Sequence, residues 1–249
     1  MNRFFVSKDK IKNNKIIIDT DDVKHICKVL RFGVGDKIQV CDGDKHEYIC
    51  KITLISKDYI ECEAEEEFVS QTEPKTEVIL IQGLPKQSKM EYIIQKTTEI
   101  GISKIYPCKL ERCVVKLDGK ETTKSQRWQK VAAEASKQCG RGIIPTVNDV
   151  ALNINDAIDV LKNCDIAFAA YESEKNYSLK DLFRNYINAN KQPPKKIGFL
   201  IGPEGGLSDD EVAFIKNSNI ECVTLGNRIL RTETAGAAVT AMCMYQFEL

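Results

Sequence analysis

The feature that most constrains the fold of this chain is a regular alternation of short apolar runs and amphipathic segments from residue 73 onward. Strands that alternate with helices are typical of a parallel sheet with helical crossovers. The predicted strands are 78–82, 105–108, 166–171, 197–201 and 222–225, and the predicted helices include 125–138, 155–162 and 234–247. Ser88, Ser178 and Ser208 each precede an acidic residue by three positions, which predicts a capping box at three helix starts. We therefore expect an α/β domain over residues 73–249.

The first 72 residues are organised differently. Short alternating runs separated by glycine-containing turns predict a small β-sheet or barrel, with strands at 15–19, 36–42, 46–55 and 59–65. One helix is expected over residues 21–31, because its apolar residues share a face. The polar stretch 65–74 has the composition of a linker. The chain thus divides into two predicted domains, 1–72 and 73–249.

Composition limits the classes of protein that this chain can belong to. Of 249 residues, 43% are hydrophobic and 29% charged, with 36 basic and 36 acidic side chains, as in a soluble globular protein. No run reaches the roughly 18 apolar residues that a membrane helix needs, and the start of the chain lacks a secretory apolar region. We expect a cytoplasmic protein with no membrane partner.

Ten cysteines raise the question of a metal site. Their spacing does not support one, because no Cys-x-x-Cys pair occurs and Cys108 and Cys113 are the closest two. Most of the cysteines lie in apolar runs, where a free thiol acts as a small buried apolar group. We expect no metal, and structural or surface roles for the two histidines, His25 and His46.

The zero net charge hides an uneven distribution. Residues 84–141 contain 13 basic and 6 acidic side chains, whereas residues 1–72 and 142–249 each carry an acidic excess. A local basic excess suits an anionic polymer and would make binding dependent on salt. A solvated, lysine-rich helix face is the alternative interpretation.

Two stretches near the C-terminus carry the strongest signals for a ligand. Residues 201–208, Ile-Gly-Pro-Glu-Gly-Gly-Leu-Ser, follow a predicted buried strand, where glycines allow a ligand to approach the backbone. Their spacing matches neither GxGxxG nor GxxxxGK[ST], and residues 197–215 hold four acids and no base. This disfavours a pyrophosphate and is compatible with a cationic ligand. A plain structural turn is the alternative.

The second stretch, residues 225–235, joins a predicted strand to a helix that either Thr232 or Thr234 can cap. It contains two arginines, Arg228 and Arg231, between apolar residues. Irregular backbone of this kind can hydrogen-bond a base such as adenine while apolar side chains cover its faces. A connecting loop with solvated arginines is the alternative.

Together these residues resemble the signature of the RsmE-type 16S rRNA uridine-N3 methyltransferases of the SPOUT superfamily. The resemblance covers nearly the whole chain, with further matches at residues 3–6, 25–31, 89–91, 95–96, 111–113, 128–130 and 138–141. It implies a small N-terminal PUA-like β-barrel that binds RNA, followed by an α/β SPOUT methyltransferase domain threaded as a trefoil knot. It also implies S-adenosylmethionine as cofactor, a homodimer formed by the helix near Lys89 and the last helix, and 16S rRNA as partner within the small ribosomal subunit.

The resemblance also implies the roles of individual residues. The expected cofactor-binding residues are Ile201, Gly202, Pro203, Glu204, Gly205, Gly206, Leu225, Gly226, Ile229, Leu230, Thr232, Thr234 and Ala235. Arg231 is the first candidate to stabilise negative charge on the target base, Arg228 the second, and Glu204 a candidate orienting or proton-accepting group; a structural ion pair is the alternative for each. The expected RNA-binding residues are Arg3, Lys28, Arg31, Lys86, Lys89, Arg112, Lys116 and Arg141.

Two functions from other classes stay open on the sequence alone. A non-catalytic RNA-binding protein could keep the fold without methyl transfer, although the two glycines 205 and 206 and residues 231–234 argue against this. A nicotinamide oxidoreductase with an atypical glycine loop is disfavoured by the missing glycine fingerprint and by the acidic surroundings.

Overall fold

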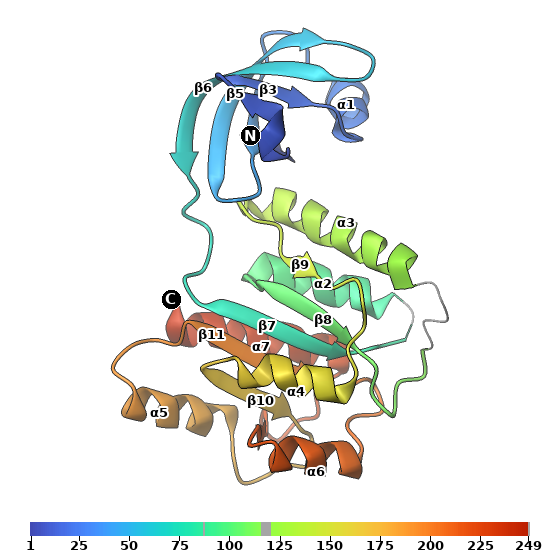
Figure 1. Cartoon of the computed structure of the whole chain (residues 1–249), viewed down its shortest axis with the longest axis vertical. Coiled ribbons are helices and arrows are strands. Elements are labelled where there is room, and N and C mark those ends of the chain that lie inside the picture. The colour runs from blue at the N-terminus through green and yellow to red at the C-terminus, as the bar shows by residue number, and fades with distance from the viewer. Residues whose placement is uncertain (87, 116–120, 249) are drawn as a thin grey trace. The chain divides into compact units, whose positions relative to one another are not determined.

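The computed structural model describes residues 1–86, 88–115 and 121–248 (Figure 1). The chain forms two compact units. The first contains Met1–Glu73 together with Ser136–Ile144, and the second contains Pro74–Ala135 and Pro145–Leu249. The first unit therefore includes a segment from the middle of the chain, which the sequence pattern had placed in the second domain.

The first unit is built on one six-stranded sheet. Its strand order is β1 (Arg3–Phe5), β4 (Lys37–Cys41), β5 (His46–Ile55), β6 (Ile60–Val69), β3 (Lys15–Ile18) and β2 (Ile11–Lys12). Neighbouring strands are antiparallel except for the parallel pair β1 and β4. Alternate residues such as Ile16 and Ile18 point into the core and are fully buried, as the period of a half-buried strand requires. A short 3-10 helix, η1 (Lys8–Lys10), precedes β2.

Two expectations for this unit are corrected. The acidic run 65–67 belongs to β6 rather than to a linker, because its backbone pairs with β5 while its carboxylates stay exposed. The helix expected over residues 21–31 is short and irregular, with α1 (Asp22–Lys24) passing into a π-type turn, η2 (His25–Val29). It ends at Arg31, whose φ of 57° lies in the left-handed region and stops a right-handed helix.

The middle segment is attached to the first unit through Glu73. The Glu73 carboxylate accepts hydrogen bonds from the Arg141 guanidinium at 2.7 Å and from the backbone amides of Gly142 and Ile143 at 3.0 and 3.1 Å. Arg141 is only 5% exposed. Because a buried ion pair is costly to break, Arg141 serves the fold of this unit, which argues against the phosphate contact expected of it.

The second unit contains six parallel strands in the order β12 (Glu221–Val223), β10 (Ile166–Ala170), β11 (Lys196–Ile201), β7 (Glu77–Gly83), β8 (Lys104–Cys108) and β9 (Thr146–Val147). The helices from residue 89 onward are α2 (Lys89–Ile100), α3 (Glu121–Cys139), α4 (Ile154–Lys162), α5 (Leu179–Ala189), α6 (Asp209–Asn217) and α7 (Thr232–Phe247), and the last four residues of α3, 136–139, belong to the first unit. The parallel α/β architecture predicted from the alternating pattern is confirmed.

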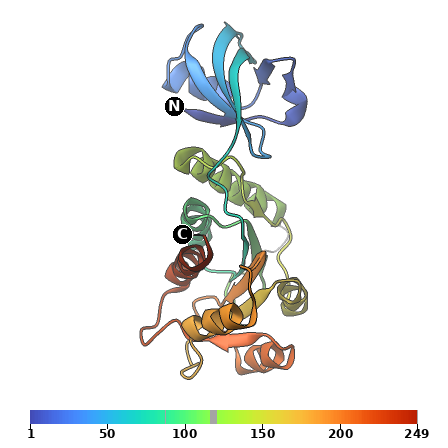
Figure 2. The same ribbon diagram turned by 90° about the vertical axis from the view of Figure 1, so that its left-hand side faces the viewer.

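Helices cover both faces of this sheet. Ile81, Ala169 and Leu200 lie in one apolar cluster with residues of α4 and α6. On the opposite face Phe168 and Phe199 stack with ring centroids 5.7 Å apart, against α5. Figure 2 shows α2 and α7 together on one side of the sheet and α4 on the other. Burial on both faces explains why the central strands are continuously apolar.

The helix starts agree with the prediction in two of three cases. Ser178 and Ser208 form complete capping boxes with Asp181 and Glu211. The box predicted at Ser88 is absent, because Ser88 has φ −83° and ψ 7° instead of an extended conformation and its side chain makes no capping hydrogen bond. Neither threonine caps α7, since the residue before that helix is Arg231 and its side chain makes no capping bond.

Most cysteines fill the core, as predicted. Six of the ten, Cys41, Cys50, Cys62, Cys108, Cys222 and Cys243, are buried, and all ten are free thiols. Burial raises the pKa of Cys243 to about 12, so this thiol stays protonated. The described residues contain no group of three or more potential ligands that could hold a metal ion. Within the same residues, no helix combines the length and apolar character of a membrane span.

Glu248 links the end of α7 to the start of β7, and its removal should destabilise the second unit. Its carboxylate accepts hydrogen bonds from the backbone amides of Lys75 at 2.9 Å and Thr76 at 2.7 Å. Burial raises the pKa of Glu248, but these amide hydrogen bonds outweigh it and hold the pKa below its ordinary value. We expect Glu248→Ala to lower the free energy of unfolding by about 1–3 kcal/mol near neutral pH, measured by urea denaturation.

The effect of Glu248 should depend on pH. Because its folded pKa is lowered, the stabilisation is present above the ordinary carboxyl pKa of about 4.3 and is lost as the pH falls through the lower folded value. The stabilities of the wild type and Glu248→Ala should therefore converge progressively as the pH falls from about 4.3 through the lower folded pKa. Gln246→Ala, which changes an exposed neighbour, is the control. A difference that does not shrink in acid would contradict this role for the carboxylate.

Candidate active site

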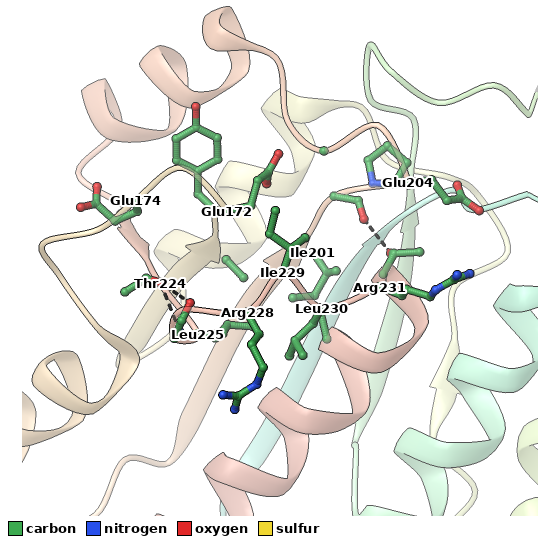
Figure 3. Close-up of a pocket in the computed structure, with 18 of the residues that line it drawn as sticks. Glu172, Glu174, Ile201, Glu204, Thr224, Leu225, Arg228, Ile229, Leu230 and Arg231 are labelled. Atoms are coloured by element: carbon green, nitrogen blue, oxygen red, sulfur yellow. Dashed lines mark hydrogen bonds between the residues drawn. The ribbon is translucent and has the colours of Figure 1, made fainter.

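The two stretches singled out in the sequence meet around one cavity. It has a volume of about 690 Å³ and lies beyond the carboxyl ends of β10, β11 and β12 (Figure 3). Residues of both stretches line it, namely Ile201, Gly202, Pro203, Glu204, Gly205, Gly206, Leu225, Gly226, Arg228, Ile229, Leu230, Arg231, Thr232 and Ala235. Thr234 is exposed and does not line the cavity. The structure thus brings together every predicted cofactor-binding residue except Thr234.

Glycine is favoured at two positions of the turn after β11, at Gly206 by its left-handed backbone and at Gly202 by the close approach of another backbone segment. Gly206 has φ 70°, and a Cβ atom there would lie 2.2 Å from the carboxylate of Glu172. A Cβ atom at Gly202 would lie 3.0 Å from the backbone of Gly206. The turn therefore needs glycine for its backbone conformation and for close packing. The Gly206 amide closes it with a hydrogen bond to the Pro203 carbonyl at 2.9 Å.

Thr232 connects the two stretches. Its buried hydroxyl donates a hydrogen bond to the Gly202 carbonyl at 2.7 Å and accepts one from Nε2 of Gln82 at 2.8 Å. Gln82 is fully buried and lies at the end of β7. This hydroxyl therefore joins the start of α7, the glycine turn and the central sheet at one point.

The segment between β12 and α7 lines the cavity and contains backbone amides that donate no hydrogen bond within the described residues. It begins with a tight turn in which the Gly226 amide donates to the Thr224 hydroxyl at 3.2 Å and φ at Gly226 is 116°. Within the described part of the chain, the backbone amides of residues 227–230 donate no hydrogen bond. Ile229 is 82% exposed. Open amides beside apolar side chains suit the edge and faces of a flat heterocycle.

Glu204 is held by the start of α2. Its Oε1 atom accepts hydrogen bonds from the Lys86 amide at 3.0 Å and from Nζ of Lys89 at 3.1 Å. Burial raises the pKa of Glu204, but these two donors outweigh it and lower the pKa below its ordinary value. A carboxylate with a lowered pKa is a weak proton acceptor, so the geometry favours the orienting role expected for Glu204 over the proton-accepting one.

The two arginines of the site point in different directions. Figure 3 shows the guanidinium group of Arg231 on the side of Glu204 and that of Arg228 pointing away from it. Both side chains are exposed, and neither forms an ion pair or hydrogen bond with any residue that the structure describes. The structural ion pair, which the sequence left as an alternative, is therefore seen for Glu204 and not for these arginines.

Sequence reasoning missed the loop that follows β10. Tyr171, Glu172, Glu174 and Lys175 line the cavity from this loop. Glu174 is fixed by the backbone amides of Lys175 and Asn176 at 3.1 and 3.0 Å. A signal was present, because ligands in such sheets contact loops at the carboxyl ends of several neighbouring strands, and the strand before this loop was predicted.

The predicted RNA-binding residues fall into distinct environments. Lys28 and Arg31 are exposed on the first unit, whereas Arg3 of that unit pairs with the buried Glu47 at 3.0 Å. In the second unit Lys86 and Arg112 are exposed, and Arg112 also donates to the Gly205 carbonyl at 3.0 Å.

Lys89 and Lys116 complete the predicted RNA-binding set. Lys89 is engaged by two carboxylates, those of Glu204 at 3.1 Å and Glu233 at 3.3 Å, and so is not a free cation. Lys116 lies outside the described residues. The pairing of Lys89, like that of Arg3 and Arg141, argues against a phosphate contact.

Comparison with known families agrees with this site. A model of an RNA methyltransferase domain matches residues 72–244, and a model of an RNA methyltransferase PUA domain matches residues 18–65. The first match covers more than half of the chain. The PUA-like character predicted for the N-terminal part and the methyltransferase character predicted for the C-terminal part are confirmed.

Solved structures of related proteins share the whole fold. A ribosomal RNA small subunit methyltransferase E from Neisseria gonorrhoeae bound to S-adenosyl methionine is 27% identical, with a TM-score of 0.87 over 99% of this chain and 98% of that one. A putative methyltransferase from Legionella pneumophila in complex with SAM is 25% identical, with a TM-score of 0.86 over 98% of this chain and 96% of that one.

Curated relatives extend over the full length of the chain. Ribosomal RNA small subunit methyltransferase E of Bacillus subtilis is 35% identical over 255 residues, covering 100% of this chain and 98% of the relative. The protein of the same name from Mesomycoplasma hyopneumoniae is 30% identical, covering 98% and 99% respectively. The resemblance inferred from the sequence is thereby confirmed, and the chain belongs to the ribosomal RNA small subunit methyltransferase E family of RNA methyltransferases.

Proposed function

We propose that this protein transfers a methyl group from S-adenosylmethionine to N3 of a uridine in 16S rRNA, within the small ribosomal subunit. The observation that carries the proposal is the cavity in which the glycine turn and residues 224–232 face each other. Two relatives with the same fold, at 27% and 25% identity, are described in complex with this cofactor. We also propose that the reaction takes place in the cytoplasm, because the proposed substrate is ribosomal RNA.

The residues of the cavity fit S-adenosylmethionine. When bound, this cofactor supplies a methyl group on a positively charged sulfur. Four acids, Glu172, Glu174, Glu204 and Glu233, and four bases, Lys89, Lys175, Arg228 and Arg231, line the cavity, which suits a ligand with both positive and negative groups. The amides of residues 227–230, which donate no hydrogen bond within the described residues, could hydrogen-bond the adenine edge, and Leu225, Ile229 and Leu230 would cover its faces.

Methyl transfer to N3 of uracil places three demands on the protein. N3 lies on the pairing edge, so the base must be unpaired or turned out of its helix into the cavity. The N3 proton must pass to solvent before or as the N3–methyl bond forms and the methyl–sulfur bond of the donor breaks, and the negative charge left on the base spreads onto the ring oxygens. We assign stabilisation of this charge to Arg231, with Arg228 as second candidate, because positioned cations act strongly where charge develops. We assign Glu204 an orienting role, because its ion pair with Lys89 holds the glycine turn against the start of α2. The third demand is that the methyl donor and N3 of the base are aligned.

The two parts of the chain have separate proposed roles. We assign RNA binding to the PUA-like domain, 1–72, and methyl transfer to the SPOUT domain, 73–249, whose trefoil knot stays a prediction. A homodimer through α2 and α7 is supported by large apolar side chains exposed on these two helices. They are Tyr92, Met242 and Tyr245, with exposed fractions of 50%, 40% and 76%.

Removing exposed charges from the first unit should weaken RNA binding in a way that depends on salt. For each cation that no longer neutralises a phosphate, the slope of log affinity against log salt should become shallower by about 0.7. We expect the pair Lys28→Gln and Arg31→Gln to weaken binding to 16S rRNA and flatten this slope, measured by filter binding over a salt series. The matched control, Lys180→Gln with Arg184→Gln, removes two exposed charges from α5. Equal slopes for wild type and the Lys28 and Arg31 pair would refute this interface.

Mass spectrometry of ribosomal RNA tests the function directly. Cells that lack the protein should lose one N3-methyluridine from 16S rRNA, and the purified protein with S-adenosylmethionine should restore it on isolated small subunits. If methylation is restored on free 16S rRNA but not on isolated subunits, the substrate is the free RNA and not the assembled subunit. If ribosomal RNA from cells with and without the protein carries the same methyl groups, while calorimetry shows that the protein binds S-adenosylmethionine, a non-catalytic RNA-binding function would be favoured.

A further inference from the structure

One carboxylate of the cavity lacks a counter-charge. Glu172 lines the cavity from the loop after β10, and Figure 3 shows its side chain above Ile201. Among the residues that the structure describes, no Lys, Arg or His nitrogen lies within 4.0 Å of this carboxylate, and no donor hydrogen-bonds it. Glu172 is exposed and therefore presents a carboxylate without a protein partner at the edge of the cavity.

The other acids of the cavity are already engaged. Glu204 and Glu233 share Lys89, at 3.1 and 3.3 Å. Glu174 accepts two backbone amides and pairs with Lys216 at 3.4 Å, and the hydrogen bond from the Asn176 amide is the main cause of its lowered pKa. These three carboxylates already have partners within the protein. Glu172 is the described acid of the cavity that remains available to a ligand.

The position of Glu172 is tied to the shape of the glycine turn. A Cβ atom at Gly206 would lie 2.2 Å from one carboxylate oxygen of Glu172 and 3.1 Å from its carboxyl carbon. Glycine at this position, with its φ of 70°, therefore leaves the space that the carboxylate occupies. The loop after β10 thus places the unpaired carboxylate of Glu172 against the glycine turn that follows β11 and lines the cavity.

We propose that Glu172 binds a positive charge of the methyl donor. This inference rests on the proposed function, because it assigns a residue to that cofactor. S-adenosylmethionine carries two positive groups, the sulfonium and the α-ammonium. A carboxylate without a partner in the protein gains a charge-assisted interaction with either, without first breaking an ion pair.

Binding measurements on three ligands test the proposal. They are S-adenosylmethionine, S-adenosylhomocysteine, which keeps only the ammonium, and 5′-methylthioadenosine, which has neither positive group. By calorimetry, Glu172→Gln should weaken binding of S-adenosylmethionine about three- to tenfold and leave 5′-methylthioadenosine unchanged. If S-adenosylhomocysteine weakens equally, the partner of Glu172 is the ammonium; if it is unchanged, the partner is the sulfonium.

The controls separate local recognition from a general effect of charge. Asp210→Asn removes the same charge from an exposed position in the first turn of α6, outside the cavity, and should leave all three affinities unchanged. Equal weakening of 5′-methylthioadenosine and S-adenosylmethionine by Glu172→Gln, or no weakening of either, would overturn the role of Glu172. Failure of the wild-type protein to bind S-adenosylmethionine would instead overturn the proposed function.

Discussion

Replacing Arg231 with alanine is expected to lower the rate of methyl transfer by about 100- to 1,000-fold, the usual cost of removing a group that stabilises developing charge. Binding of S-adenosylmethionine should change by less than about threefold, because the guanidinium acts on the target base and not on the donor. Single-turnover transfer of a labelled methyl group to unmethylated small subunits measures the rate, and calorimetry measures cofactor affinity.

The structure gives a reason to rank Arg231 above Arg228. Both side chains are exposed and without an ion-pair partner among the described residues, but only the Arg231 guanidinium lies on the side of Glu204 (Figure 3). Arg231 also precedes the first turn of α7, where the positive end of the helix dipole adds to its effect on an anion. Arg228→Ala should therefore reduce the rate less than Arg231→Ala does.

A control variant guards against a general effect of charge on RNA binding. Arg184→Ala removes an exposed arginine from α5 that pairs with Asp181 and does not line the cavity, so turnover should be unchanged. If Arg231→Ala transfers methyl groups at the wild-type rate, Arg231 has no part in the reaction. If it loses cofactor affinity in proportion to rate, Arg231 belongs to the cofactor site.

The α/β architecture of the second unit could be predicted because its signals are local. A strand buried on both faces must be apolar along its length, as the run that forms β11 is, and Ser208 with Glu211 marks the following helix start by side-chain chemistry alone. The same local signals located the glycine turn and residues 225–235. They could not show that these stretches share a cavity, because parallel pairing of β10 with β11 and β12 brings them together.

Three predictions made from neighbouring residues were wrong because a residue far away in the sequence determines the local structure. The acidic run 65–67 has linker composition, but pairing with the backbone of β5 makes it part of a strand. Glu91 was expected to cap its own helix at Ser88 and instead pairs with Arg127 of α3 at 2.8 Å. Arg141 was expected on the surface, yet Glu73, 68 positions away, holds it in the interior. Such contacts join residues far apart in the sequence, so no window of neighbours predicts them.

The loop after β10 is the part of the site that the sequence did not reveal. Its residues Tyr171 to Lys175 contain no glycine fingerprint and no arginine, so they carry no motif. Position alone marks them, because β10 lies between β11 and β12 and its carboxyl end opens on the same cavity. The general rule for open α/β sheets would have identified this loop once the strand order was known.

Thr232 and Thr234 could not be distinguished from the sequence, and they should behave very differently. The Thr232 hydroxyl is buried between the Gly202 carbonyl and Gln82 Nε2, whereas Thr234 is exposed. Valine keeps the branched shape of threonine but removes the hydroxyl. Thr232→Val leaves a buried donor and a buried acceptor without their partner, and we expect it to lower the free energy of unfolding by about 2–3 kcal/mol. Urea denaturation measures this change.

The same substitution should also impair the cavity, because Thr232 joins the glycine turn to the start of α7. We expect Thr232→Val to weaken S-adenosylmethionine binding at least about tenfold, equivalent to 1.4 kcal/mol. Thr232→Ser retains the hydroxyl and should recover most of the affinity, while Thr234→Val should resemble the wild type in both measurements. Wild-type affinity in a destabilised Thr232→Val protein would mean that this hydroxyl supports the fold without shaping the cofactor site. Loss of affinity in Thr234→Val would mean that the exposed threonine, and not the buried one, contacts the cofactor.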